Sequence, residues 1–115
     1  MARKAARRPR ARPAARVFAA LGDPTRLALV DKLADGARRS IAQLSEGETV
    51  TRQAITKHLR VLESAKIVRS ERAGRETLYV LDPLPISEAR TYIDAVARRW
   101  DEALGRLKAF AENLP

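Results

Sequence analysis

Residues 51 to 64, TRQAITKHLRVLES, group side chains that could bind a nucleic acid on one side of an expected helix. At about 100° per residue, Ile55, Leu59 and Leu62 share one face of that helix, and the opposite face is polar. Arginine and lysine can donate to guanine, glutamine can pair bidentately with adenine, and a threonine methyl can pack on thymine. The candidate DNA-binding residues of this helix are Arg52, Gln53, Thr56, Lys57, His58, Arg60 and Ser64.

Position along the helix divides these residues into two groups. Residues near the N-terminus of such a helix reach furthest into a major groove, so we expect Gln53, Thr56 and Lys57 to read bases. Arg52 and Arg60 are expected to bind phosphates instead. The alternative is a basic helix that only faces solvent.

His58 lies between the apolar and polar faces, and it is the single histidine of a chain without cysteine. Such a chain lacks the ligands of a conventional zinc site, so we predict no metal and no cofactor. We expect His58 either to pack within the protein or to touch a phosphate. The sequence contains no Gly-rich phosphate loop and no interpretable nucleophile–histidine motif, and it does not predict an enzyme.

A second basic group lies just after this helix. The stretches IVRSER and RETLYVL, separated by Ala73 and Gly74, predict a β-hairpin over residues 67–81. Arginines at and near its tip could lie along the minor groove, as in a wing. They are Arg69, Arg72 and Arg75. Glu71 and Glu76 leave open a structural hairpin with solvent-facing charges.

Local signals bound the helices that must hold this surface in place. VFAAL, from Val17, indicates the end of a first helix that stops near Gly22. Asp23 can cap a second helix, with Pro24 at its first position and Gly36 past its end. The expected buried residues of this second helix are Leu27, Val30, Leu33 and Ala34.

Ser40 and Gln43 form a capping box that predicts a short third helix in SIAQLS. Thr51 is the expected cap of the next helix, and Val50 before it can pack on Ile55 as a hydrophobic staple. The turn between these two helices sets the second at a steep angle. The polar helix should therefore project from the body.

A long terminal helix is expected after Asp82 and Pro83, with apolar positions every three or four residues. It exceeds what a small domain needs to cover its own core, so we predict a homodimer with Trp100 as an anchor. The alternative for Trp100 is a place in the core of its own chain. The candidate interface residues are Val17, Phe18, Leu21, Ile93, Val96, Trp100, Leu104, Leu107 and Ala111.

The net charge of the 115 residues, +9, is concentrated in two regions. Residues 1–13 carry six basic and no acidic side chains, and residues 51–72 carry six basic against two acidic ones. We expect 1–13 to be a disordered basic arm that reinforces nucleic-acid binding, and 14–115 to be one domain for DNA binding and dimerisation. Plain solvated disorder and a transit peptide are alternatives for the arm.

The predicted order is three helices, a polar-faced helix, a hairpin and a long helix. It defines a mainly α fold with a small β-hairpin, a winged helix-turn-helix with a helical dimer interface. The segments ALGDPTRLALVDKL, SIAQL, TRQAITKHLRVLESAKIV and GRETLYVLDP resemble the ArsR-type winged-helix repressors over about residues 17–114. The resemblance implies a homodimeric bacterial repressor that binds a palindromic operator through its fourth helix.

Two departures from the family pattern matter. Metal-sensing branches carry cysteines in the helix that corresponds to SIAQLS, or Asp and His ligands on the terminal helix. Here the first stretch has no cysteine and residues 86–114 have no histidine, so the non-metal branch, with its central tryptophan, is the more similar one. The family also places glycine where this chain has Lys66, so the helix before it could end differently or run on.

We therefore predict a regulator of double-stranded DNA whose two reading helices lie in major grooves roughly 34 Å apart, on an inverted repeat. No apolar run approaches the roughly 20 residues of a membrane span, and we expect a cytoplasmic, nucleoid-associated protein. A sequence-independent architectural protein and a protein-interaction module are the alternatives. The sequence does not indicate the operator, the regulated genes or a small-molecule effector.

Overall fold

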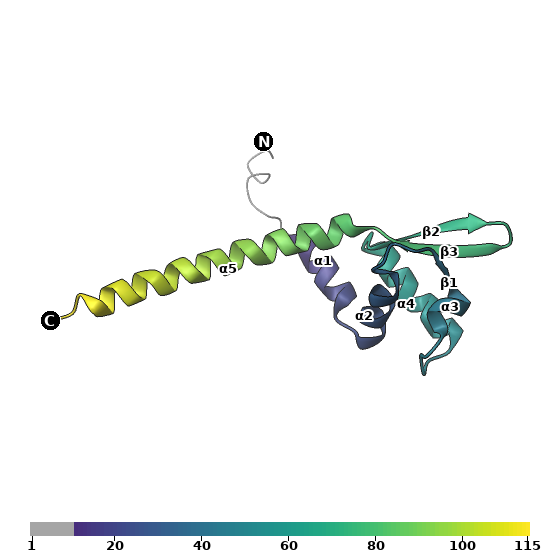
Figure 1. Cartoon of the computed structure of the whole chain (residues 1–115), viewed down its shortest axis with the longest axis horizontal. Coiled ribbons are helices and arrows are strands. Elements are labelled where there is room, and N and C mark those ends of the chain that lie inside the picture. Colours follow the sequence, from purple (N-terminus) through teal and green to yellow (C-terminus); the bar gives the residue numbers. More distant parts are fainter. Residues whose placement is uncertain (1–10) are drawn as a thin grey trace.

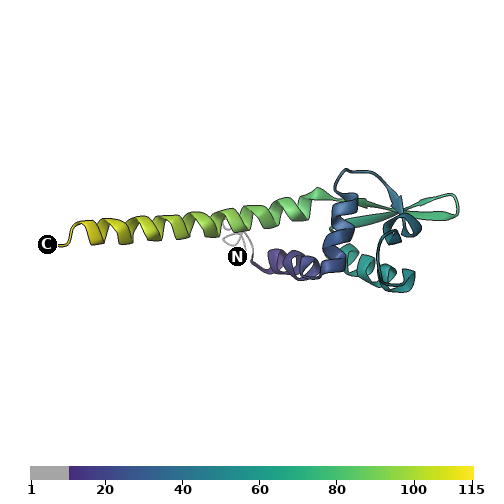
Figure 2. The ribbon, with the colours of Figure 1, turned by 60° about the horizontal axis from the view of Figure 1, so that its bottom comes forward.

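A computed structural model describes residues 11–115, which form a compact body and a long helix that leaves it (Figure 1). The elements are α1 (Ala11–Leu21), α2 (Pro24–Leu33), β1 (Arg39–Ser40), α3 (Ile41–Ser45), α4 (Arg52–Ser64), β2 (Val68–Ala73), β3 (Glu76–Leu81) and α5 (Pro83–Glu112). The C-terminus and the β2–β3 hairpin lie at opposite ends of the molecule (Figures 1 and 2). None of the helices within residues 11–115 is long and apolar enough to cross a membrane.

The three strands form one antiparallel sheet in the order β1-β3-β2. Its hairpin closes through a two-residue turn, Gly74 and Arg75, which lies one residue later than the expected Ala73 and Gly74: Ala73 pairs with Glu76, and Gly74 adopts a φ of 66°. Strand β1 was not expected. Its two residues, Arg39 and Ser40, are too few to show an alternating pattern, and they pair with Tyr79 and Leu78.

The helix caps form as the sequence predicts. Asp23 Oδ2 accepts hydrogen bonds from the backbone N–H groups of Thr25 at 2.9 Å and Arg26 at 3.1 Å. Ser40 and Gln43 make the reciprocal capping box, and Thr51 Oγ1 accepts from Ala54 N at 3.1 Å. Each cap satisfies backbone donors that the first helical turn leaves free.

The core lies between α2, α3, α4 and the sheet. Its largest fully buried side chains are Leu29, Leu33, Leu44, Ile55, Leu59, Leu62, Ile67 and Val68. Our choice of the buried face of α2 was partly wrong, because Leu27 is 49% exposed and Ala34 is exposed, whereas Leu29 is buried. Apolar residues surround α2 on several sides, so their spacing alone does not select one face.

Helix α1 begins at Ala11 and lies against the first half of α5, where the rings of Phe18 and Tyr92 are 6.3 Å apart. The disordered arm expected over residues 1–13 therefore extends too far along the sequence, because residues 11–13 are helical. Residues 1–10 lie outside the described part of the chain. Pro13 is tolerated because the first backbone N–H groups of a helix have no intrahelical partner. Val17, which we expected at an interface, is 5% exposed within its own chain.

Lys66 ends α4 in the left-handed conformation, with a φ of 65°. The N–H of Lys66 donates to Glu63 O, and the N–H of Ile67 donates to Leu62 O, both at 2.9 Å. This is the Schellman pattern, completed by the burial of Leu62 and Ile67. The helix does not run on, and a lysine occupies a position that favours glycine.

We predict that Lys66→Gly stabilises the protein by roughly 0.5–1 kcal/mol, because the relief of left-handed strain exceeds the entropy that glycine adds to the unfolded chain. The measurement is urea unfolding followed by circular dichroism. Lys57→Gly is the matched control, and it should cost about 0.5–1 kcal/mol because Lys57 is inside α4. A loss of stability in both variants would contradict this account of Lys66.

Candidate nucleic-acid interface

The exposed side of α4 carries the residues that the sequence selected. Ile55, Leu59 and Leu62 are completely buried, which turns the opposite side of the helix to solvent. Arg52, Gln53, Lys57, Arg60 and Ser64 are exposed there, and Thr56 is half-buried. The Thr56 hydroxyl donates to the Arg52 carbonyl at 3.0 Å, so its hydrogen-bonding capacity is partly used within the helix.

A lysine side chain of α2 holds the turn between α3 and α4 in place. Lys32 Nζ donates to Leu44 O at 2.9 Å and forms an ion pair with Glu48 Oε2 at 3.0 Å. Within the turn, Gly47 adopts a φ of 79°, which glycine reaches without strain. This lysine therefore holds the chain between α3 and α4 that sets the angle of the polar helix.

His58 faces inward from α4 to the start of α2 instead of joining the exposed group. Its Nδ1 lies 3.1 Å from Arg26 Nη1 and 3.8 Å from Asp23 Oδ2, and its side chain is 23% exposed. The Arg26 guanidinium has only donors, so Nδ1 acts as the acceptor in this contact. Of our two expectations for His58, these contacts favour packing within the protein.

Arg26 is a residue that sequence reasoning missed. Its Nε donates to the Ala20 carbonyl at 2.6 Å, its Nη2 to the Ala19 carbonyl at 3.4 Å, and its Nη1 meets His58. One side chain thus ties the end of α1 and the start of α2 to α4. The signal in the sequence was slight: an arginine three residues after a helix cap, and 32 residues away from its histidine partner.

Asp23 completes this contact group. The pKa of its carboxyl group is lowered, chiefly by the hydrogen bond from the Arg26 backbone N–H and also by the nearby positive charge of the Arg26 guanidinium. The carboxylate caps α2 and lies beside both basic side chains. The group Asp23, Arg26 and His58 is therefore a structural junction at the base of α4.

The hairpin exposes Arg69, Arg72 and Arg75, while one of its carboxylates is engaged elsewhere. Glu71 pairs with Arg38 at 2.5 Å, and the hydrogen bond from Arg38 is the main cause of its lowered pKa. A second contact runs from the Ser70 hydroxyl to Glu63 Oε2 at 2.8 Å and joins the hairpin to α4. These contacts offset part of the negative charge near the wing arginines.

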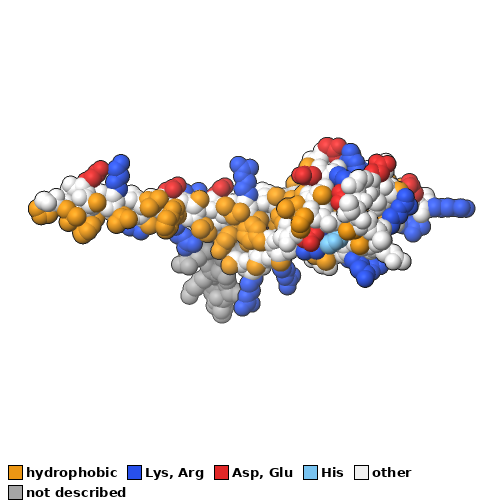
Figure 3. Space-filling model, turned by 90° about the horizontal axis from the view of Figure 1, so that it is seen from below, with side chains coloured by type: hydrophobic (Ala, Val, Ile, Leu, Met, Phe, Trp, Pro, Cys, Tyr) orange, Lys and Arg blue, Asp and Glu red, His pale blue; other side chains and the backbone are white. Residues whose placement is uncertain are grey.

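Basic side chains project from the hairpin end of the molecule, and hydrophobic side chains form a band along α5 (Figure 3). Basic side chains are not confined to the hairpin end, because Arg98, Arg99 and Arg106 are exposed on α5. Among residues 11–115, no group of three or more His, Cys, Asp and Glu side chains gathers closely enough to hold a metal ion.

Comparisons with known proteins agree with this geometry. A family model described as a helix-turn-helix domain matches residues 21–71. The chain is 38% identical over 89 residues to the HTH-type transcriptional regulator Rv2034 of Mycobacterium tuberculosis, covering 77% of this chain and 79% of that protein. It is 33% identical over 91 residues to the HTH-type transcriptional repressor SmtB of the same species, covering 79% of this chain and 65% of the repressor.

A solved structure shows the same relationship in three dimensions. An ArsR-like transcriptional regulator from Rhodococcus sp. RHA1 superposes with a TM-score of 0.76 at 34% identity, covering 89% of this chain and 95% of that one. The fold and its exposed α4 define a helix-turn-helix transcriptional regulator, a DNA-binding protein and not an enzyme. Within that class, the chain belongs to the ArsR-type family.

The junction at the base of α4 gives a second prediction. Arg26→Met keeps an unbranched side chain but removes the donors to Ala20 and His58, so it should destabilise the protein by about 2–3 kcal/mol in urea unfolding. Arg52→Met is the control, because Arg52 is exposed and should change stability by less than about 0.5 kcal/mol. Equal effects of the two substitutions would mean that the Arg26 contacts add nothing to stability.

Proposed function

We propose that this protein is a sequence-specific repressor that binds an inverted-repeat operator in double-stranded DNA as a homodimer. Helix α4 enters the major groove, and the hairpin lies along the neighbouring minor groove as a wing. The observation that carries the proposal is the division of α4 into a fully buried apolar face and an exposed basic and polar face. Helix α5 runs away from α4, so the chain's own last helix leaves that face open (Figure 1).

The roles proposed for the exposed residues follow their positions on α4. Gln53 and Lys57 lie in the first half of the helix and, with Thr56, are proposed to contact bases. Arg52 and Arg60 are proposed to bind phosphates, together with Arg69, Arg72 and Arg75 of the wing. Such a protein would act in the cytoplasm, on the nucleoid.

Selection of bound fragments from genomic DNA tests the function and yields the operator. Titration of that operator and a scrambled duplex at matched salt then separates two possibilities. A repressor of this kind should prefer its operator at least about 1,000-fold. Near-equal affinities would favour the alternative, an architectural protein that uses the same basic surface without reading sequence.

Substitutions within α4 distinguish residues that contact bases from residues that bind phosphates. We predict that Gln53→Ala relaxes the preference at one base pair per half-site, by about 1–3 kcal/mol of discrimination, because only a base contact carries sequence information. Arg60→Ala should weaken all duplexes about equally and reduce the dependence of affinity on salt. Fluorescence anisotropy on single-base operator variants measures both effects. If both substitutions weaken every duplex alike, the assignment of Gln53 is wrong.

The exposed stripe of α5 supports the proposed homodimer. Trp100 is 64% exposed, which rules out our alternative of a core tryptophan within one chain. Leu104 and Leu107 are 44% and 63% exposed on the same helix. Large apolar side chains in such a row usually mark an interface.

We predict that the wild-type protein sediments as two chains at micromolar concentration and that Trp100→Glu shifts it to one chain, because a charge would enter the apolar contact. Leu84→Glu is the control: Leu84 is 60% exposed at the start of α5, outside the stripe, and should leave the assembly unchanged. A wild-type monomer, or equal effects of the two substitutions, would argue against this interface.

A further inference from the structure

Arg38, in the loop between α2 and β1, forms an ion pair with the wing hairpin. Its Nε donates to Glu71 Oε1 at 2.5 Å, and its Nη2 donates to Glu71 Oε2 at 3.4 Å. Two donors of one guanidinium thus face the two oxygens of one carboxylate, the geometry that makes such pairs directional. None of the candidate DNA-binding residues chosen from the sequence lies in this loop, yet the loop directly contacts β2.

Strand β1 is what brings Arg38 to β2. Ser40 of β1 pairs with Leu78 of β3, and Leu78 pairs with Glu71 of β2. Paired residues lie on the same face of a sheet, and residues two apart along a strand share a face. Arg38, two residues before Ser40, therefore lies on the face of Glu71, and its side chain reaches across β3 to meet it. The strand that the sequence did not predict thus connects this loop to the wing.

Contacts within the loop hold Arg38 in place. Arg39 donates through Nη1 and Nη2 to the two carboxylate oxygens of Asp35, each at 2.9 Å, and Ala37 N donates to Asp35 Oδ1 at 3.0 Å. These hydrogen bonds, chiefly that from Arg39, lower the pKa of Asp35 to about 2. Gly36 makes the turn with a φ of 82°. The position of Arg38 is therefore set by its own loop as well as by Glu71.

The face that Arg38 reaches carries charges of both signs. Arg69 lies two residues before Glu71 on β2 and so shares its face. The pKa of Glu71 is lowered, chiefly by the hydrogen bond from Arg38 and also by the nearby charges of Arg38 and Arg69. Glu71 is therefore an ionised carboxylate between two arginines. With Arg38 this group is net positive, and without Arg38 it would have no net charge.

Stability alone gives this ion pair little to do. The side chains of Arg38 and Glu71 are 55% and 38% exposed, and exposed ion pairs add little to the stability of a fold. Their charges act more strongly on the potential outside the protein. At this end of the molecule basic side chains project into solvent (Figure 3). An uncompensated carboxylate there would repel the phosphates of an approaching duplex.

We propose that Arg38 is a functional residue of the DNA-binding surface, where it compensates the charge of Glu71 and so allows the DNA backbone to approach the wing. The inference rests on the proposed function and deepens it. It adds the loop before β1 to α4 and the hairpin as a third segment of that surface. Arg38 acts through Glu71, so it is a positioning residue and does not read bases.

Two substitutions that break the same ion pair test this role, because they change the local charge in opposite directions. The affinity of the full-length protein for one fluorescently labelled duplex of random sequence is measured by anisotropy at low salt. Arg38→Gln should weaken binding and Glu71→Gln should strengthen it, each by about 2- to 20-fold. That range corresponds to a unit charge about 10 Å from a phosphate, between the dielectric constants of water and of a protein surface.

The double variant Arg38→Gln, Glu71→Gln should bind within about 2-fold of the wild type, because the two changes of charge cancel. Added salt should reduce both single effects, since it screens exposed charges.

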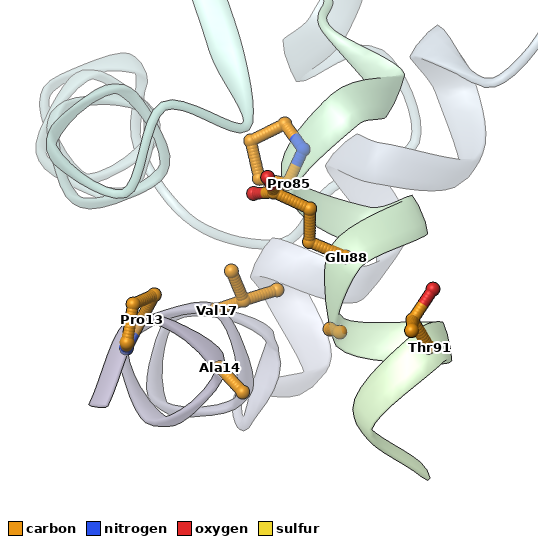
Figure 4. Close-up of a pocket in the computed structure, with 7 residues that line it drawn as sticks. Pro13, Ala14, Val17, Pro85, Glu88 and Thr91 are labelled. Carbon is orange, nitrogen blue, oxygen red and sulfur yellow. The ribbon is translucent and has the colours of Figure 1, made fainter. Parts of the chain in front are cut away.

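Matched controls make the same changes of charge away from the wing. Glu88 lines the hollow between α1 and α5, together with Pro13, Val17 and Pro85 (Figure 4). Arg106 is exposed on the outer half of α5. Glu88→Gln and Arg106→Gln should each leave the affinity for the duplex close to that of the wild type.

A purely structural ion pair would give a different pattern. Both single variants would then weaken binding alike and the double variant would be no better, and that result overturns the proposal. A Glu71→Gln variant that fails to bind more tightly, or an Arg38→Gln variant that binds as well as the wild type, overturns it too. Either failure leaves the proposed repressor intact, since its test is the preference of the wild type for operator over scrambled duplex. A wild type that binds no duplex would overturn the proposed function, and this inference with it.

Discussion

The complete burial of one face of α4 is the constraint on which the rest of the structure depends. Ile55, Leu59 and Leu62 are fully buried against α2, α3 and the sheet. Each such side chain contributes roughly 1.5–3 kcal/mol through its removal from water, so a rotation of α4 about its axis would lose several kcal/mol. The exposed residues from Arg52 to Ser64 therefore face outward because the core requires the other face, and their geometry is fixed before any DNA is present.

Polar contacts then fix α4 at its sides and at both ends. Arg26 and His58 join it to α2, the Ser70–Glu63 hydrogen bond joins it to the hairpin, and Lys32 holds the turn before it. At its end, the left-handed Lys66 turns the chain directly into β2. These contacts hold α4 and the hairpin together, an arrangement that the proposed binding in two adjacent grooves would require.

Features with a local cause could be predicted from the sequence. The caps at Asp23, Ser40 and Thr51, the hairpin turn at Gly74 and the buried face of α4 each depend on residues close in the chain. The exposure of Arg52, Gln53, Lys57, Arg60 and Ser64 followed from the same periodicity. Thr56 and His58 are instead half-buried, and the periodicity had placed His58 at the boundary between the two faces.

Features that depend on distant contacts could not be predicted in this way. The pairing of β1 with β3, the inward contact of His58 with Arg26 and the burial of Leu29 instead of Leu27 each need a partner from another part of the chain. The end of α4 is a mixed case. The sequence identified Lys66 as a strained site, but the Schellman hydrogen bonds that keep it left-handed became evident only in the structure.

The extension of α5 beyond α1 has a consequence for how the protein folds. Every residue from Arg90 to Glu112 is exposed or half-buried, so the outer turns of this helix have few contacts with the body. Most of the stability of a helix in a protein comes from tertiary packing of its apolar face, and these turns lack such packing within one chain. In a solitary chain these turns would fray, and pairing with a second copy would order them as it buries them. Assembly would then be coupled to folding, with a more negative heat capacity change than the docking of two preformed rods.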